Sequence, residues 1–360
     1  MLDGVGGAFA INASTSFDRT NYYETVPKNR LELALSLEAS RMTFVTIDQE
    51  RLDEQREVVR REREQRYETS PYGLANLTLW QKIFPQSNPY HGYVIGSHKD
   101  LEAATLDDVK SFYDRYYGPS NATLAIVGDF DEVEVKALVA KYFATLPKTK
   151  RASTPIIPQV KIERQEIIRV DEKLGQLPLL RMQWITPSIF KNGDADLDIA
   201  SIIIGKGENA LLKKALTRDK SLANQVSVYQ HSMGQTSVFT IDVLLNPGVD
   251  ENQVIEEIDR VIAQVTAGNI EKNDIERSRN SIMTNYYFDL QELGGGSGKT
   301  ELLQTYNHYT NDPSYMQKDL ARYKAVTAQT LSATVKRCLK PNQRKILIAA
   351  PENIHVAQRN

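Results

Sequence analysis

Apolar residues recur every three or four positions through most of the first half of the chain, and this spacing predicts amphipathic helices. The helices that we expect from the pattern span residues 27–42, 48–68, 105–117 and 131–147. The first opens on a proline, and Thr105 begins a Thr-x-x-Asp capping pattern at the start of the third. The uninterrupted apolar run ATLAIVGDF at residues 122–130 instead predicts a buried strand that ends at a glycine.

This pattern occurs twice in the chain. Residues 103–128 align without a gap with residues 325–350, at an offset of 222 positions. Thr105 falls on Thr327, and a helix, a proline and an apolar strand follow in the same order in both segments. The charged helix at 48–68 also recurs, at an offset of 223. The repeat therefore predicts two copies of one α+β domain.

The repeat also sets the domain boundaries that we expect. The first domain spans residues 1–147, a polar, proline-bearing linker spans 148–163, and the second domain spans 164–360. By the same offset, a complete first copy would start about 57 residues before Met1. We therefore expect its opening strand and first helix to be missing from this chain, which would leave an apolar face and a strand edge uncovered.

A glycine cluster at residues 291–304, QELGGGSGKTELLQ, invites comparison with a phosphate-binding loop. Such a loop needs a buried strand before its glycines, whereas the preceding residues here have a helical pattern. The spacing also fails, because Leu293 stands where the loop motif requires glycine. We predict a connector between two helices, and this argues against the alternative of a nucleotide-dependent protein.

Composition narrows the classes of partner and chemistry. About 41% of residues are apolar and 25% are charged, as in an ordinary globular protein. A formal net charge of −2 gives no reason to expect nucleic acid or an anionic membrane as the main partner, and the apolar runs are too short to span a bilayer. The single cysteine, Cys338, excludes an internal disulfide and a cysteine-based metal cluster, and its apolar neighbours predict a packed core thiol.

Several motifs resemble one known family. GGAFAINASTSFDRTNYYETVP (6–27), LELALSLEASRM, QREVVRRERE and the segment NPYHGY…AIVGDF are similar to successive parts of the pitrilysin/insulinase family of zinc metallopeptidases, in the same order. The resemblance implies two homologous α+β domains, each with a mixed, mainly antiparallel sheet packed against helices. It also implies a peptide or unfolded protein as substrate, and a homodimer or a heterodimer with another subunit of the family.

The resemblance implies a zinc site of which this chain carries one part. In the family, a His-x-x-Glu-His helix supplies two ligands and the general base, and a glutamate on a later helix supplies the third ligand. Residues 1–360 contain no His-x-x-Glu-His, and no two of the five histidines lie three or four residues apart. Glu62 occupies the position of the third ligand. We therefore expect zinc in the complete protein and none bound by this chain.

The helical pattern around Glu62 leaves two interpretations open. Leu52, Gln55, Val59, Glu62 and Arg66 fall on one stripe, and the two apolar residues direct it inward. A carboxylate on a buried stripe is costly unless it binds a cation or a donor, which favours a ligand. The alternative is an ion pair with Arg66, four residues further on. Gln55 stands where the family often has a further glutamate, and an amide carries no charge.

The resemblance also identifies substrate-binding residues. Asn12, Ala13 and Thr15 match an edge strand that, in the family, pairs with an extended substrate through the backbone. The alternative is a plain edge strand with a structural asparagine. The sequence thus predicts a zinc endopeptidase in its complete form, inactive as this chain alone, and the second possibility is a non-catalytic partner subunit or peptide-binding scaffold.

Overall fold

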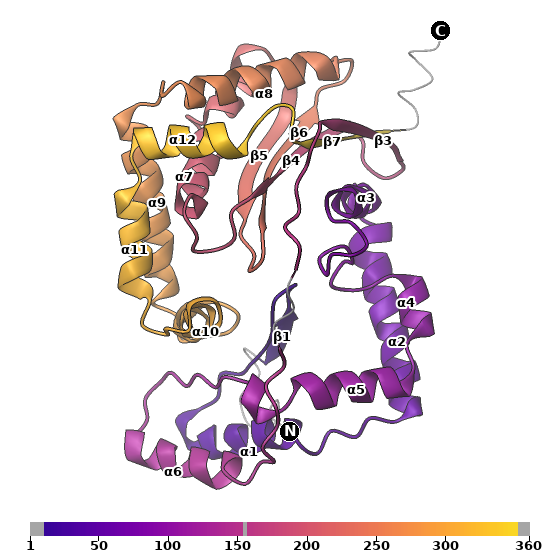
Figure 1. Ribbon diagram of the computed structural model, residues 1–360, viewed down its shortest axis with the longest axis vertical. Helices are drawn as coiled ribbons and strands as arrows, with labels where there is room; N and C mark the ends of the chain where they lie inside the picture. The colour runs from indigo at the N-terminus through magenta and orange to yellow at the C-terminus, as the bar shows by residue number, and fades with distance from the viewer. Residues whose placement is uncertain (1–10, 154–156, 352–360) are drawn as a thin grey trace. The chain divides into compact units, whose positions relative to one another are not determined.

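The computed structural model describes residues 11–153 and 157–351, which form two compact units (Figure 1). Unit 1 comprises residues 1–61, 94–156 and 285–315, and unit 2 comprises residues 62–93, 157–284 and 316–360. Each unit thus combines segments from both halves of the chain. The two units are defined by contacts in space, whereas the predicted domain boundaries are defined by the sequence repeat. The units therefore do not test those boundaries, which remain a prediction.

Unit 2 is built on a mixed sheet with the strand order β3-β7-β4-β6-β5. The strands are β3 (Glu166–Glu172), β4 (Leu179–Thr186), β5 (Ala223–His231), β6 (Ser237–Leu245) and β7 (Lys345–Pro351). β3 runs parallel to β7, and the other neighbours are antiparallel. The sheet is therefore mixed and mainly antiparallel, as predicted.

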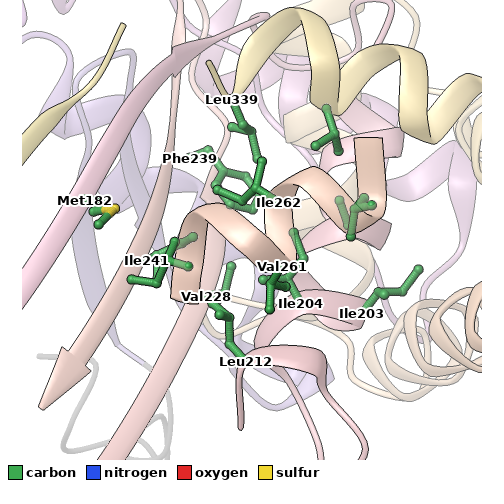
Figure 2. Packing of buried hydrophobic residues seen from close by; sticks show 14 of the residues in the cluster. Met182, Ile203, Ile204, Leu212, Val228, Phe239, Ile241, Val261, Ile262 and Leu339 are labelled. Carbon is green, nitrogen blue, oxygen red and sulfur yellow. The ribbon is translucent and has the colours of Figure 1, made fainter. Parts of the chain in front are cut away.

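Three helices cover one face of this sheet and form the main core: α7 (Asp194–Gly205), α8 (Glu251–Thr266) and α12 (Ala328–Cys338). Figure 2 shows Ile204 of α7 and Ile262 of α8 packed with Phe239 and Ile241 of β6. In α8, the buried residues Val254, Ile258, Val261, Ile262 and Val265 recur at helical spacing, which is why this segment forms an amphipathic helix. Cys338 packs partly buried against this core, as predicted, and burial raises the pKa of its thiol.

The other face of the sheet is also covered. Leu347 and Ala349 of β7 point away from the main core and are fully buried, and α3 (Gly73–Ile83) contacts β7 and β3. Arg181 of β4 pairs with Asp242 of β6 and also hydrogen-bonds Asn76 of α3. Unit 2 also contains a π-helical turn (Glu64–Glu68), a second one (Lys213–Asp219), most of α9 (Lys272–Asp289) and α11 (Met316–Ala325).

Unit 1 is mainly helical in the part of the chain that the structure describes. Its elements are β1 (Asn12–Thr15), β2 (Thr20–Tyr23), a 3-10 turn (Lys28–Arg30), α1 (Leu31–Arg41), most of α2 (Gln49–Arg63), α4 (His98–Ala103), α5 (Leu106–Tyr116), a second 3-10 turn (Pro119–Asn121), α6 (Glu132–Phe143) and α10 (Gly298–Thr310). β1 and β2 form a hairpin, and α1 packs against α6. The four helices predicted from the pattern are thus present, with shorter ends.

The repeat is visible in the helices α5 and α12. Shifting the bounds of α5 by 222 gives the bounds of α12, and both helices begin with a threonine capping box, at Thr105 and at Thr327. The surroundings of the two helices differ. α12 buries Leu331 and Val335 completely, whereas no residue of α5 is buried and Phe112 is 58% exposed.

The strand predicted at 122–130 is wrong. Residues 122–127 form no regular secondary structure and pair with no strand among the described residues, and Leu124 is exposed. The equivalent strand of the second copy, β7, lies between β3 and β4 and is paired on both sides. An apolar run forms a strand only where partner strands supply its backbone hydrogen bonds, and the described residues of the first copy offer none here.

The glycine cluster is a connector, as predicted. It joins α9, which ends at Asp289, to α10, which begins at Gly298. The backbone N–H groups of Lys299 and Thr300 donate to the carbonyl oxygens of Glu292 and Leu293, at 3.1 Å each. The N–H groups with which a helix start would hold a phosphate are therefore already used. Gly298 has a φ of +83°, and a Cβ there would lie 2.7 Å from the oxygen of Glu292, so glycine is required.

No helix in the described ranges combines the length and the apolar character that crossing a bilayer requires.

Candidate functional site

The hairpin that contains Asn12, Ala13 and Thr15 is exposed along its first strand. All four residues of β1 are exposed, and β2 is the strand with which β1 pairs in the described part of the chain. The other edge of β1 therefore offers its backbone to a further strand. Residues 8–10, which belong to the same sequence motif, lie outside the described residues.

The register of the hairpin decides which backbone groups face that open edge. The N–H of Ser16 donates to the carbonyl oxygen of Arg19 at 2.8 Å, so this pair is a hydrogen-bonded one. Hydrogen-bonded and non-hydrogen-bonded pairs alternate along an antiparallel ladder. Counting back through Thr15↔Thr20, Ser14↔Asn21 and Ala13↔Tyr22, we find that Ser14 bonds to β2, whereas Ala13 and Thr15 direct their N–H and C=O groups to the open edge.

A side-chain contact supports this assignment. The N–H of Ala13 donates to Oδ1 of Asn12 at 2.8 Å, which it could not do if it pointed at β2. Asn12 thus satisfies one of the outward-facing donors of β1 when no other strand is bound. The three residues predicted from the sequence thus lie at one edge. Ala13 and Thr15 direct backbone groups outward, and the side chain of Asn12 accepts a hydrogen bond from the N–H of Ala13.

One face of the hairpin rests on helices of unit 1. The hydroxyl of Tyr22 lies 2.8 Å from the hydroxyl of Tyr117, and the guanidinium of Arg41 lies 4.4 Å from the centre of the Tyr22 ring. Arg41 also pairs with Glu38 on α1 at 2.7 Å. Burial, followed by the Glu38 carboxylate, raises the pKa of Glu24, which follows β2, to about 7. These contacts fix the position of β2 and hence of the open edge of β1.

The other end of the hairpin is held by α10. Arg19 and Asn21 both contact the carboxylate of Glu301, and the hydroxyl of Tyr309 donates to Asp18 at 3.1 Å. The Arg19 and Glu301 side chains are 22% and 17% exposed, so solvent screens this ion pair less than a surface pair. The sequence did not predict these contacts, because the partners lie about 280 positions apart and no sequence motif links the two segments.

Glu62 lies near the end of α2, and its surroundings match the alternative interpretation. Its carboxylate pairs with Arg66 at 2.9 Å, and its side chain is 42% exposed. Leu52 and Val59 are only half-buried and Gln55 is exposed, so the predicted inward stripe is a half-buried one. The helix buries no residue completely, because its charged residues outnumber its apolar ones.

Glu62 by itself does not make a zinc site. A catalytic zinc is held by three protein ligands, and Glu62 is one carboxylate that is already paired with a cation. Nδ1 of His91, which lies in the loop after α3, donates a 2.6 Å hydrogen bond to the carbonyl oxygen of Phe84. Burial lowers the pKa of His308 in α10, which favours its neutral form.

Comparison with known proteins gives two matching family descriptions. Residues 103–282 match the family described as "Peptidase M16 inactive domain", and residues 1–79 match "Insulinase (Peptidase family M16)". The chain is 27% identical to zinc protease PqqE of Helicobacter pylori over 294 residues, which is 80% of this chain and 65% of that protein. It is 23% identical to the uncharacterized zinc protease YmxG of Bacillus subtilis, over 84% of this chain and 72% of that protein. The chain thus spans about two thirds of the length of the first of these relatives.

Solved structures share the fold. A protease from Helicobacter pylori superposes with a TM-score of 0.86 at 24% identity, covering 97% of this chain and 84% of that one. A peptidase M16 inactive domain from Pseudomonas fluorescens gives a TM-score of 0.81 at 18% identity, covering 97% and 82%. At these identities the likeness concerns the fold, and it agrees with the α+β architecture predicted from the sequence.

Proposed function

Because the chain belongs to the peptidase M16 family, we propose that it forms the peptide-binding part of a zinc peptidase of this type and does not carry a complete catalytic centre. The observation that supports peptide binding most directly is the open edge of β1. Ala13 and Thr15 direct backbone donors and acceptors outward from an exposed strand whose other edge is fixed by β2.

An extended peptide would bind as a third strand of the hairpin sheet. Its carbonyl groups would accept from the N–H groups of Ala13 and Thr15, and the first of these would displace Oδ1 of Asn12. Backbone pairing makes little use of peptide side chains, so the edge would accept many sequences. The contacts of Arg19 and Asn21 with Glu301 hold the hairpin in place, so that little ordering of β1 is needed on binding.

Substituting proline at Thr15 tests this function. Thr15→Pro removes an outward N–H and leaves the bonds of Ser14 and Ser16 to β2 intact, whereas Ser14→Pro would break the hairpin itself. One lost hydrogen bond of about 1 kcal/mol weakens affinity about fivefold. Fluorescence anisotropy with a labelled neutral, proline-free decapeptide measures this change, with Thr15→Val as the matched control that keeps the N–H. Equal affinities of Thr15→Pro and Thr15→Val would exclude β1 as the peptide edge.

Glu62 is our proposed contribution to the metal centre of the complete protein. Since three protein ligands are the usual minimum, the 360-residue chain should purify without stoichiometric zinc and without peptidase activity. A chimera that carries a His-x-x-Glu-His helix of a zinc-binding family member ahead of Met1 should hold one zinc. Glu62→Ala should then lower the zinc content sharply, whereas Glu64→Ala, two residues on, should not. Mass spectrometry of metal content decides, and one tightly held zinc in the original chain would show that other ligands exist.

The second candidate function is that of a non-catalytic subunit. It is favoured by the description of the longer family match, which is that of an inactive domain. The chimera separates the two functions, because a non-catalytic subunit would bind peptide through β1 yet hydrolyse none even after zinc is restored. Hydrolysis by the zinc-loaded chimera would favour the peptidase.

A further inference from the structure

A second surface of the chain also has the features of a peptide-binding site. Unit 2 contains a groove of about 690 Å³, which we call the linker groove. One wall is formed by Lys82 and Ile83 at the end of α3 with residues of the loop 85–88, a second wall is formed by segment 158–164, and Lys345 completes the lining. All of these residues belong to one compact unit.

The linker groove is strongly positive in a chain whose net charge is −2. Lys82, Lys161, Arg164 and Lys345 line it against a single carboxylate, that of Glu163, which leaves an excess of three positive charges. Lys345 pairs with Glu166, and its hydrogen bond, followed by the charges of Lys82 and Arg164, lowers the pKa of Glu166. The charges of Lys82 and Arg164 therefore both act on the Glu166 carboxylate, although the two residues come from different walls of the groove.

Three of these cations are available to a ligand. In the described ranges, Lys82, Lys161 and Arg164 take part in no ion pair, in contrast to most arginines of α2. Lys82, Lys161 and Arg164 are exposed, whereas Lys345 is 15% exposed and already paired. An anionic group that enters the groove would therefore gain three partners without breaking an existing pair.

The backbone of the second wall is also available. Residues 157–163 form no helix or turn, and Ile162 is buried at 6% exposure between the exposed residues Lys161 and Glu163, which is the alternation of an extended chain. The sheet ladder begins only at Glu166, where β3 pairs with β7, and residues 159–163 form no backbone hydrogen bond with the described residues. An extended backbone with unused N–H and C=O groups is a template for another extended chain.

We propose that the linker groove binds an extended acidic peptide segment. Its backbone would pair with residues 159–163, and its carboxylates would contact Lys82, Lys161 and Arg164. The cations select acidic side chains, and the free backbone selects an extended peptide over a compact anion. This site shares no residue with the β1 edge and does not rest on the function proposed for that edge.

Charge reversal tests the proposal with a matched control. Lys82→Glu/Lys161→Glu/Arg164→Glu changes the net charge by the same amount as Lys173→Glu/Lys191→Glu/Lys336→Glu, whose residues are exposed cations of unit 2 outside the groove. The probe is a fluorescein-labelled decapeptide of alternating Asp and Val, followed by anisotropy at about 50 mM salt, where screening is weak. The groove variant should bind it at least about tenfold more weakly than wild type, and the control variant less than about twofold.

Two further probes test the role of the backbone and of charge. The same decapeptide with Asn in place of Asp should bind wild type and the groove variant equally, because it offers no carboxylate to the groove. The acidic decapeptide with alternate amides N-methylated should bind more weakly, because it cannot pair with residues 159–163. The proposal is overturned if wild type does not bind the acidic probe, if both triple variants weaken alike, or if N-methylation has no effect. Circular dichroism confirms that each variant is folded.

Discussion

The two copies of the repeat place equivalent residues in different surroundings, and this difference can be measured. Leu331 of α12 is 0% exposed, and the equivalent residue of α5, Val109, is only half-buried. Leu331→Ala removes three methylene-sized groups, or about 2.4 kcal/mol of transfer free energy at about 0.8 kcal/mol each, and leaves a cavity in addition. We expect a loss of about 3 kcal/mol in the free energy of unfolding. Val109→Ala removes two groups at half burial, which corresponds to about 0.8 kcal/mol.

Urea unfolding gives the two values separately. Both tryptophans of the chain, Trp80 and Trp184, are buried in unit 2, so their fluorescence reports on that unit, and circular dichroism reports on both. With a slope of about 3 kcal/mol per molar urea, Leu331→Ala should lower the fluorescence midpoint by about 1 M. Val109→Ala should lower the dichroism midpoint by less than about 0.3 M. Lys336→Ala on the exposed side of α12 serves as the control, and a Val109→Ala shift as large as that of Leu331→Ala would refute the argument from burial.

Three further predictions follow from the same structure. Amide hydrogen exchange should be faster across residues 11–147 than across 164–351, because α5 buries no residue and residues 122–127 have no partner strand in the described ranges; uniform protection would contradict this. Calorimetric titration with ATP and Mg²⁺ should show no saturable binding, because the N–H groups of Lys299 and Thr300 are already used; micromolar binding that Lys299→Ala abolishes would disprove the connector. Burial, and then the Asp194 carboxylate, raise the pKa of Asp198 to about 7, so folding takes up a proton and wild-type stability falls as pH rises from about 4 to about 7. Asp198→Asn removes this loss, and its melting temperature relative to wild type should rise over that range; a difference that does not change with pH would contradict the assignment.

Local interactions explain what the sequence could predict. The helix after Thr105 was predictable because its capping box lies within four residues, and the pairing of Glu62 with Arg66 was foreseen as an alternative because the two lie one helical turn apart. The strand at 122–130 failed because strand formation depends on partners distant in sequence. For the same reason, no pattern pointed to Glu301 as the partner of Arg19. The outward direction of the Ala13 and Thr15 backbone groups follows from the turn at Ser16–Arg19. Predicting it requires the register of the hairpin as well as the motif.

The composition of unit 1 has a consequence for biosynthesis. Its hairpin is held by Glu301 and Tyr309, which belong to its last segment, residues 285–315, whereas the segment before that ends at residue 156. A ribosome that adds about 5–20 residues per second needs about 10–30 s to reach Tyr315 from there. During this interval the sheet of unit 2 is only partly synthesised as well, because β7 comes last. For many seconds the hairpin of the nascent chain therefore has its contacts with Tyr117 and Arg41 but not those with Glu301 and Tyr309, and the β1 edge reaches its final support only after α10 has been synthesised.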